Sequence, residues 1–131
     1  MQVQDDYLLR MIRRIAVALA AMLRGGPGDE ASFDEAAMEA FGLTTAMMER
    51  MPVDRLVTTV RRARMPEGVA LAMVGLRLKV SADTATGEVQ QERRQRAVEL
   101  LEAALELRGS VDGVDLREQV RQLRAGLIVR G

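Results

Sequence analysis

The sequence contains no cysteine, no histidine and no tryptophan among its 131 residues. Without cysteine, the chain has no disulfide bond, no thiolate nucleophile and no cysteine-ligated metal. Without histidine, it also lacks the side chain that most often serves as a general base or metal ligand near neutral pH. We therefore predict no catalytic residues, no metal site and no cofactor.

The chain also lacks a net charge, because 19 basic and 19 acidic residues cancel. A neutral protein has no overall field that attracts nucleic acid or an acidic membrane, so a charged partner must meet a local patch. Neutrality also removes long-range repulsion between copies, which favours self-association. Lys79 is the only lysine, and the abundance of arginine over lysine is typical of GC-rich bacterial genomes.

A long hydrophobic run is also missing. The apolar run Ile15–Leu23 has nine residues, whereas a helix needs about 20 to cross a bilayer. A signal peptide is disfavoured, because Asp5 and Asp6 interrupt the basic leader and only Ile15–Val17 precede the cleavage-like triplet Ala18–Ala20. We therefore expect the protein in the cytoplasm.

What the sequence does contain is helical periodicity. Apolar residues recur at intervals of three and four, no segment alternates for long with period two, and glycine and proline fall at element edges. The predicted fold is a single all-α domain over 1–131, a compact array of about five to seven helices. It comprises an N-terminal helix at 1–24, a Gly/Pro linker at 25–31, a helical middle at 32–80, a loop at 81–87 and a C-terminal helical hairpin at 88–131.

Local signals place the helix ends. Ser32 with Glu35, and Asp115 with Glu118, have the three-residue spacing of a capping box, so Ser32 and Asp115 are each predicted to begin a helix. Gly109 is predicted to end the helix that precedes it. The predicted helices span 5–24, 32–42, 45–51, 53–65, 67–80, 88–108 and 115–127.

Two short segments carry a family resemblance. Gln4–Ile12 reads Gln-Asp-Asp-Tyr-Leu-Leu-Arg-Met-Ile, and Phe41–Thr44 reads Phe-Gly-Leu-Thr. They resemble an uncharacterised family of short all-helical bacterial proteins, a domain of unknown function, that opens with an Asp-Tyr-apolar-apolar-Arg box. This family has no assigned activity, so the resemblance supplies no functional residues. The last two helices, Glu92–Leu105 and Asp115–Leu127, also resemble one antiparallel tetratricopeptide-type hairpin, which implies binding of proteins or peptides.

Three carboxylates lie close together in the last third of the chain. Glu99, Glu102 and Glu106 have spacings of three and four, so they share one face of a helix. Helical di-metal sites add histidines to such carboxylates, and this chain has none, so we interpret the face as solvated. A histidine-free enzyme that uses paired carboxylates is an alternative function, and it requires a pocket that holds such a pair.

Two arginine clusters offer another alternative function, nucleic-acid binding. Such clusters grip phosphates when they converge on one face, but no stacking aromatic residues accompany these two. The clusters consist of Arg61, Arg62 and Arg64, and of Arg93, Arg94 and Arg96.

Methionine is abundant where aromatic residues are scarce: the chain has nine methionines, two phenylalanines and one tyrosine. Methionine fills irregular gaps in a core, and we interpret the methionine-rich middle in this way. The alternative is an adaptable groove for a partner helix. The first helix is apolar nearly all round from Ile15 to Leu23, so it needs cover on more than one side.

We therefore predict a helical module for protein–protein interaction or oligomerisation, with a homodimer through the first helix as the preferred assembly. Membrane-surface binding by the same helix is the runner-up, which Asp5 and Asp6 disfavour. The predicted partner surface consists of Ile15, Leu19, Met22, Met47, Met48 and Met51.

Overall fold

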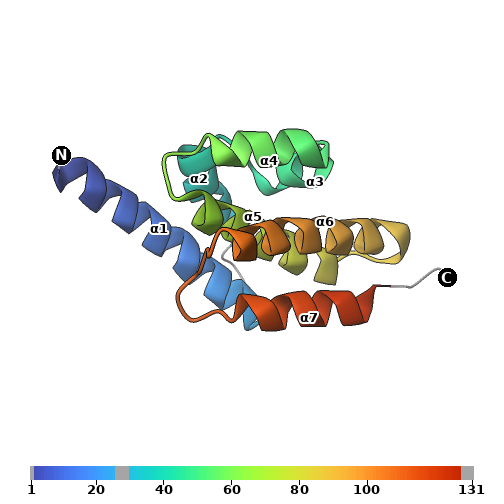
Figure 1. The fold of residues 1–131 in the computed structure, drawn as a ribbon. Helices are drawn as coiled ribbons and strands as arrows, with labels where there is room; N and C mark the ends of the chain where they lie inside the picture. Colours follow the sequence, from blue (N-terminus) through green and yellow to red (C-terminus); the bar gives the residue numbers. More distant parts are fainter. Residues whose placement is uncertain (1, 26–29, 128–131) are drawn as a thin grey trace.

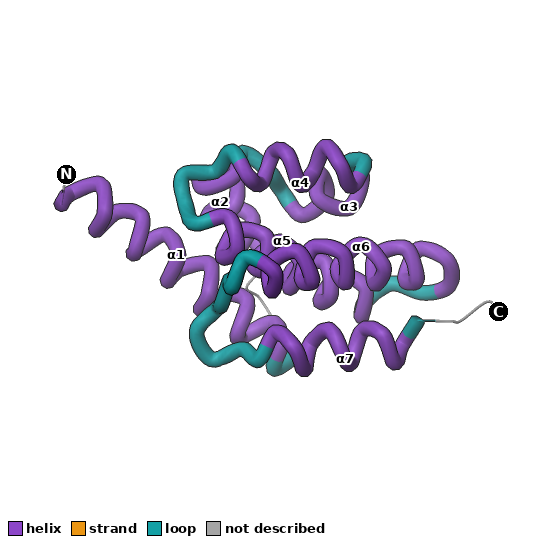
Figure 2. The backbone as a smooth tube through the Cα atoms, viewed as in Figure 1, coloured by secondary structure: helices purple, strands orange, loops and turns teal. Residues whose placement is uncertain are grey.

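In the computed structural model, which describes residues 2–25 and 30–127, the chain forms seven helices and no strand (Figures 1 and 2). The predicted all-α fold is thereby confirmed. The helices are α1 (Gln2–Leu23), α2 (Glu30–Phe41), α3 (Thr45–Arg50), α4 (Val53–Arg61), α5 (Glu67–Asp83), α6 (Gly87–Glu106) and α7 (Leu116–Gly126). None of these helices is both long enough and apolar enough to cross a membrane.

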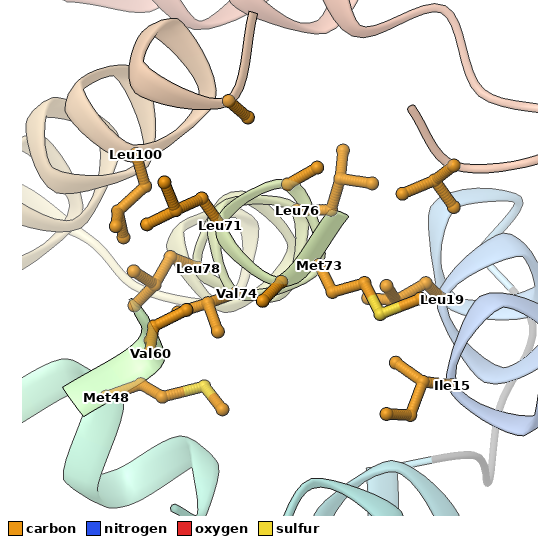
Figure 3. Packing of buried hydrophobic residues seen from close by; sticks show 14 of the residues in the cluster. Ile15, Leu19, Met48, Val60, Leu71, Met73, Val74, Leu76, Leu78 and Leu100 are labelled. Carbon is orange, nitrogen blue, oxygen red and sulfur yellow. The ribbon is translucent and has the colours of Figure 1, made fainter. Parts of the chain in front are cut away.

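Helix α5 lies at the centre of the fold. Every side chain from 70 to 78 is buried, because the sequence of α5 is apolar nearly all round and such a helix needs cover on every side. Helix α6 provides the most extensive cover, and α1, α3, α4 and α7 also contact α5. Figure 3 shows Leu19 of α1, Met48 of α3, Val60 of α4 and Leu100 of α6 converging on it.

Glycine allows the backbone to come unusually close at the start of α5. A Cβ atom on Gly68 would lie 2.8 Å from the Cα atom of Gly109, and a Cβ atom on Gly109 would collide with the Gly68 carbonyl group. The chain leaving α6 therefore touches α5 backbone to backbone. Gly109 was predicted to end the helix, and α6 ends at Glu106, after which Arg108 adopts the left-handed conformation with a φ of 57°.

Three predicted boundaries in the first two thirds of the chain are wrong. Helix α2 begins at Glu30, whose carboxylate interacts favourably with the positive end of the helix dipole. Ser32 is therefore an exposed residue of the first turn and not the N-terminal cap. The Gly/Pro linker is correspondingly shorter, and its residues 26–29 lie outside the described residues. Helix α4 ends at Arg61, four residues earlier than predicted, and the amides of Arg62 and Ala63 there bond to carbonyls three residues back, which tightens the last turn.

The third wrong boundary is the loop predicted at 81–87. Helix α5 continues to Asp83, since Ser81 and Ala82 are buried and the Ser81 hydroxyl donates a hydrogen bond to Glu49 of α3. Only residues 84–86 connect α5 to α6. This contact partner is 32 residues distant in the sequence, so no local pattern around Ser81 reveals it.

The C-terminal hairpin follows the prediction more closely. Asp115 caps α7, and its Oδ1 accepts a hydrogen bond from the Glu118 amide at 3.2 Å. Helices α6 and α7 run antiparallel (Figure 1). An ion pair between Glu102 of α6 and Arg124 of α7 joins them.

Candidate protein-interaction surface

Most of the predicted partner surface is buried inside the chain. Helices α2 and α5 cover the face of α1 that carries Ile15, Leu19 and Met22, and Met48 of α3 is fully enclosed. Met51 is half-buried, and Met47 is 41% exposed. These six residues therefore form no single accessible surface in this fold.

The accessible apolar side chains of α1 lie on its other face. Leu9 is 60% exposed and Val17 is 63% exposed, which makes them the two most exposed large apolar residues in the described part of the chain. They are eight residues apart, roughly 12 Å along a helix, and Arg13 lies midway on the same face. Sequence reasoning missed this stripe, although the four-residue spacing of Leu9, Arg13 and Val17 was a signal that could have revealed it.

A hollow of about 460 Å³ runs beside this stripe, between α1, the start of α5 and the loop at 110–112. We call it the α1 groove. Its more buried lining residues are small or apolar, whereas Leu9 and Val17 are exposed at its edge and Asp112 is exposed on the opposite wall. The buried and half-buried lining includes Ile12, Ala16, Ala20, Val69, Met73 and Val111.

Arginines border the same stripe on its other side. A second hollow of about 460 Å³ lies between α1 and α2, and Arg10, Arg13, Arg14 and Val17 line it. None of the ion pairs among the described side chains involves Arg13. The Arg10 Nε donates only to the Asp6 backbone carbonyl, at 3.4 Å. The exposed face of α1 thus combines apolar side chains with the guanidinium groups of Arg10 and Arg13, which form no ion pair with the side chains that the structure describes.

The third arginine of this group has a partner on α2. The Arg14 Nη1 lies 3.8 Å from the Glu39 Oε2, and both side chains are about half exposed. The Tyr7 hydroxyl also donates to Glu39, and this hydrogen bond raises the pKa of Tyr7 above its ordinary value. Glu39 therefore connects the end of α2 to the outer turns of α1.

Methionine contributes a smaller and separate apolar surface. Met47 and Met51 line a hollow of about 340 Å³ with Pro52, and Arg50 and Arg55 border it. This hollow belongs to α3 and α4, which lie apart from α1 (Figure 1). Met48 thus belongs to the core and Met47 and Met51 to this hollow, whereas Met38 is exposed on α2.

The two arginine clusters do not converge. Arg93 pairs with Glu49 at 3.3 Å, and Arg94 donates to the Gly126 carbonyl at 2.9 Å. Arg96 is 7% exposed and donates to the backbone carbonyls of Met48 and Met51. The contacts of this cluster therefore join α6 to α3 and α7. The other cluster, Arg61, Arg62 and Arg64, is exposed at the end of α4.

A second buried polar network ties α2, α3 and α5 together. The Asp34 Oδ1 accepts from the Thr45 amide at 2.9 Å and from the Thr45 hydroxyl at 2.5 Å. The Arg77 Nε donates to the same hydroxyl at 2.9 Å, and its guanidinium lies 5.7 Å from the centre of the Phe33 ring. Burial lowers the pKa of Arg77, an effect that the Asp34 carboxylate opposes. The network satisfies its own polar groups, so we assign it to stability.

The three carboxylates of α6 face solvent or pair with an arginine. Glu99 and Glu106 are exposed, and Glu102 pairs with Arg124. No three acidic side chains in the described residues form a group that could hold a metal ion.

Comparison of the chain with known protein families, curated proteins and solved structures finds no match. The family and tetratricopeptide resemblances of the sequence therefore stay predictions.

Proposed function

We propose that this protein is a non-enzymatic helical module of the cytoplasm that binds another protein chain through the exposed face of α1. The observation that carries the proposal is the pair of exposed side chains, Leu9 and Val17, at the edge of the α1 groove. Exposed apolar side chains beside a hollow are typical of docking surfaces for helices.

The two alternative functions find less support. An enzyme that uses paired carboxylates needs both in one pocket, but the α1 groove contains a single carboxylate, that of Asp112. Nucleic-acid binding needs a continuous basic face, but Arg93 and Arg96 are occupied by contacts within the chain. Protein binding requires neither feature.

A homodimer through α1, which the sequence favours, is one form of this proposal. Such a dimer would use Leu9 and Val17, because Ile15, Leu19 and Met22 are buried. Light scattering of the purified protein over a concentration series measures whether copies associate. A dimer that Val17→Asp disrupts would identify the partner as a second copy.

Photo-crosslinking in the native host tests the proposal itself. We would place p-benzoylphenylalanine at Val17 and, as a matched control, at Val89, an exposed valine on α6. The expected result is a discrete cross-linked species for position 17 and none for position 89. Equal patterns at both positions, or no cross-link at either, would contradict the proposal.

A further inference from the structure

The length of the exposed stripe beside the α1 groove matches about two turns of a partner helix. Leu9 and Val17 mark a stripe of roughly 12 Å along α1. The small side chains of Ala16 and Ala20, in the half-buried lining, leave room for larger apolar residues of a partner. A helix that places apolar residues at intervals of three and four fills such a groove along its length.

The charge of the surface selects among such helices. Arg13 lines the α1 groove, the hollow between α1 and α2, and a further hollow at the outer end of α1. Arg10 lines the last two. The described acids lie at the margins, with Asp6 at the outer end and Asp112 on the opposite wall. The centre of the surface is therefore basic.

A second copy of the chain fits this surface poorly. A symmetric dimer uses the same patch of both copies, so the guanidinium groups of Arg10 and Arg13 from both copies would lie within one interface. Unpaired like charges across an interface oppose association. A flat lipid surface also fits poorly, because Ala16 and Ala20 lie in the recessed lining and only Leu9 and Val17 are strongly exposed.

We infer that the α1 groove binds an acidic amphipathic helix of a different protein, whose carboxylates pair with Arg13 in the groove and with Arg10 beyond its edge. The inference rests on the proposed function and specifies the chemistry of the partner. Asp112 lies on the opposite wall, so the acidic residues of the partner lie on the flank that faces α1.

Three labelled peptides test the charge preference. Each has about 18 residues, or five helical turns, and the same leucine stripe, but the polar positions carry glutamate, glutamine or lysine. Fluorescence anisotropy with the full chain measures the three affinities. We expect the glutamate peptide to bind about tenfold more tightly than the glutamine peptide, and the lysine peptide most weakly. Raising the salt from about 0.1 M to about 1 M should remove most of the preference, because screening shortens the range of charge interactions.

Matched variants locate the effect on α1. Arg13→Glu should abolish or reverse the preference, whereas Arg117→Glu, an equal charge change at an exposed position on α7, should leave it intact. Val17→Asp should weaken the binding of all three peptides, whereas Val89→Asp should leave the binding of all three unchanged.

The outcomes separate this inference from the proposed function. If the three peptides bind with equal affinity and Val17→Asp weakens their binding, the preference for an acidic partner is overturned and the proposed function stands. A dimer that Val17→Asp disrupts, or flotation with phosphatidylserine vesicles that it abolishes, would overturn the inference by identifying another occupant. No binding by any peptide would overturn the inference, and the cross-link at position 17 would still decide the proposed function.

Discussion

Helices α5 and α1 are both strongly apolar, yet the fold treats them differently. Helix α5 is covered by five other helices and has no exposed side chain from 70 to 78. Helix α1 buries one face against α2 and α5 and leaves Leu9 and Val17 exposed, and its first turns project beyond the other helices (Figure 1). Apolar composition shows that a helix needs cover, but the number of neighbouring helices decides how much cover it receives.

Truncation of one leucine in each helix gives the sharpest contrast. Leu76→Ala in α5 removes a fully buried side chain and should lower the free energy of unfolding by about 3 kcal/mol, through lost burial and the cavity left behind. Leu9→Ala should change it by less than about 0.5 kcal/mol, because the side chain is largely exposed. Urea denaturation measures both. Similar losses for the two variants would break the comparison.

A substitution at the backbone contact of α5 should also be strongly destabilising. Gly109→Ala places a Cβ against the Gly68 backbone, so one of the two segments must shift, at a cost of about 2 to 3 kcal/mol. Gly113→Ala is the control, since its Cβ meets nothing but its φ is 78°, and it should cost about 1 kcal/mol. Thermal denaturation should show the larger loss for Gly109→Ala, and the reverse order would contradict the close contact.

The polar network beside α5 is expected to contribute less than its apolar core. Thr45→Val keeps the shape of the side chain but removes a hydroxyl that donates to Asp34 and accepts from Arg77. We expect a loss of about 2 kcal/mol, because buried partners stay unsatisfied. Thr58→Val removes an exposed hydroxyl that bonds within its own helix, and it should change stability by less than about 0.5 kcal/mol. Equal losses of unfolding free energy in Thr45→Val and Thr58→Val would show that the network does not contribute to stability.

The smallest effect should come from a pair far from the core. The hydrogen bond from Arg121, whose Nε lies 2.8 Å from the Glu118 Oε2, lowers the pKa of Glu118 from 4.5 to about 2. A carboxylate with a lower pKa in the folded state stabilises the fold above its unfolded pKa, and this contribution disappears as the pH falls from about 4.5 to about 2. Carboxyl NMR titration should show the low pKa in the native chain and a rise towards the ordinary value in Arg121→Ala. An unchanged titration would rule out this pair as the cause.

Local patterns predicted those features whose causes are local. The cap at Asp115 depends on an amide three residues away, and the α1 face with Ile15 and Leu19 follows from helical spacing. By contrast, the position of Arg96 depends on carbonyls of α3 and its flank, which are 45 and 48 residues away. The spacing of arginines on α6 therefore suggested a surface cluster, whereas in the fold Arg96 is buried and its hydrogen bonds join α6 to α3.

The α1 residues of the predicted partner surface and the surface that we propose lie on opposite faces of the same helix. The periodicity of α1 reveals an apolar face and an apolar run, but it does not state which side its neighbours occupy. Only the positions of α2 and α5 show that Met22 is enclosed and that Val17 is accessible. The groove itself needs the loop at 110–112, more than ninety residues from Val17 in the sequence.

The unequal cover of α5 and α1 also provides an internal reference for hydrogen exchange. Residues 70–78 of α5 are buried, so we expect exchange of their amides with solvent to require opening of the whole fold and to report its global free energy. Amides in the projecting outer turns of α1 exchange through fraying. A bound helix should therefore slow exchange in α1 at concentrations where α5 hardly changes, so one mass spectrum can distinguish local docking from general stabilisation.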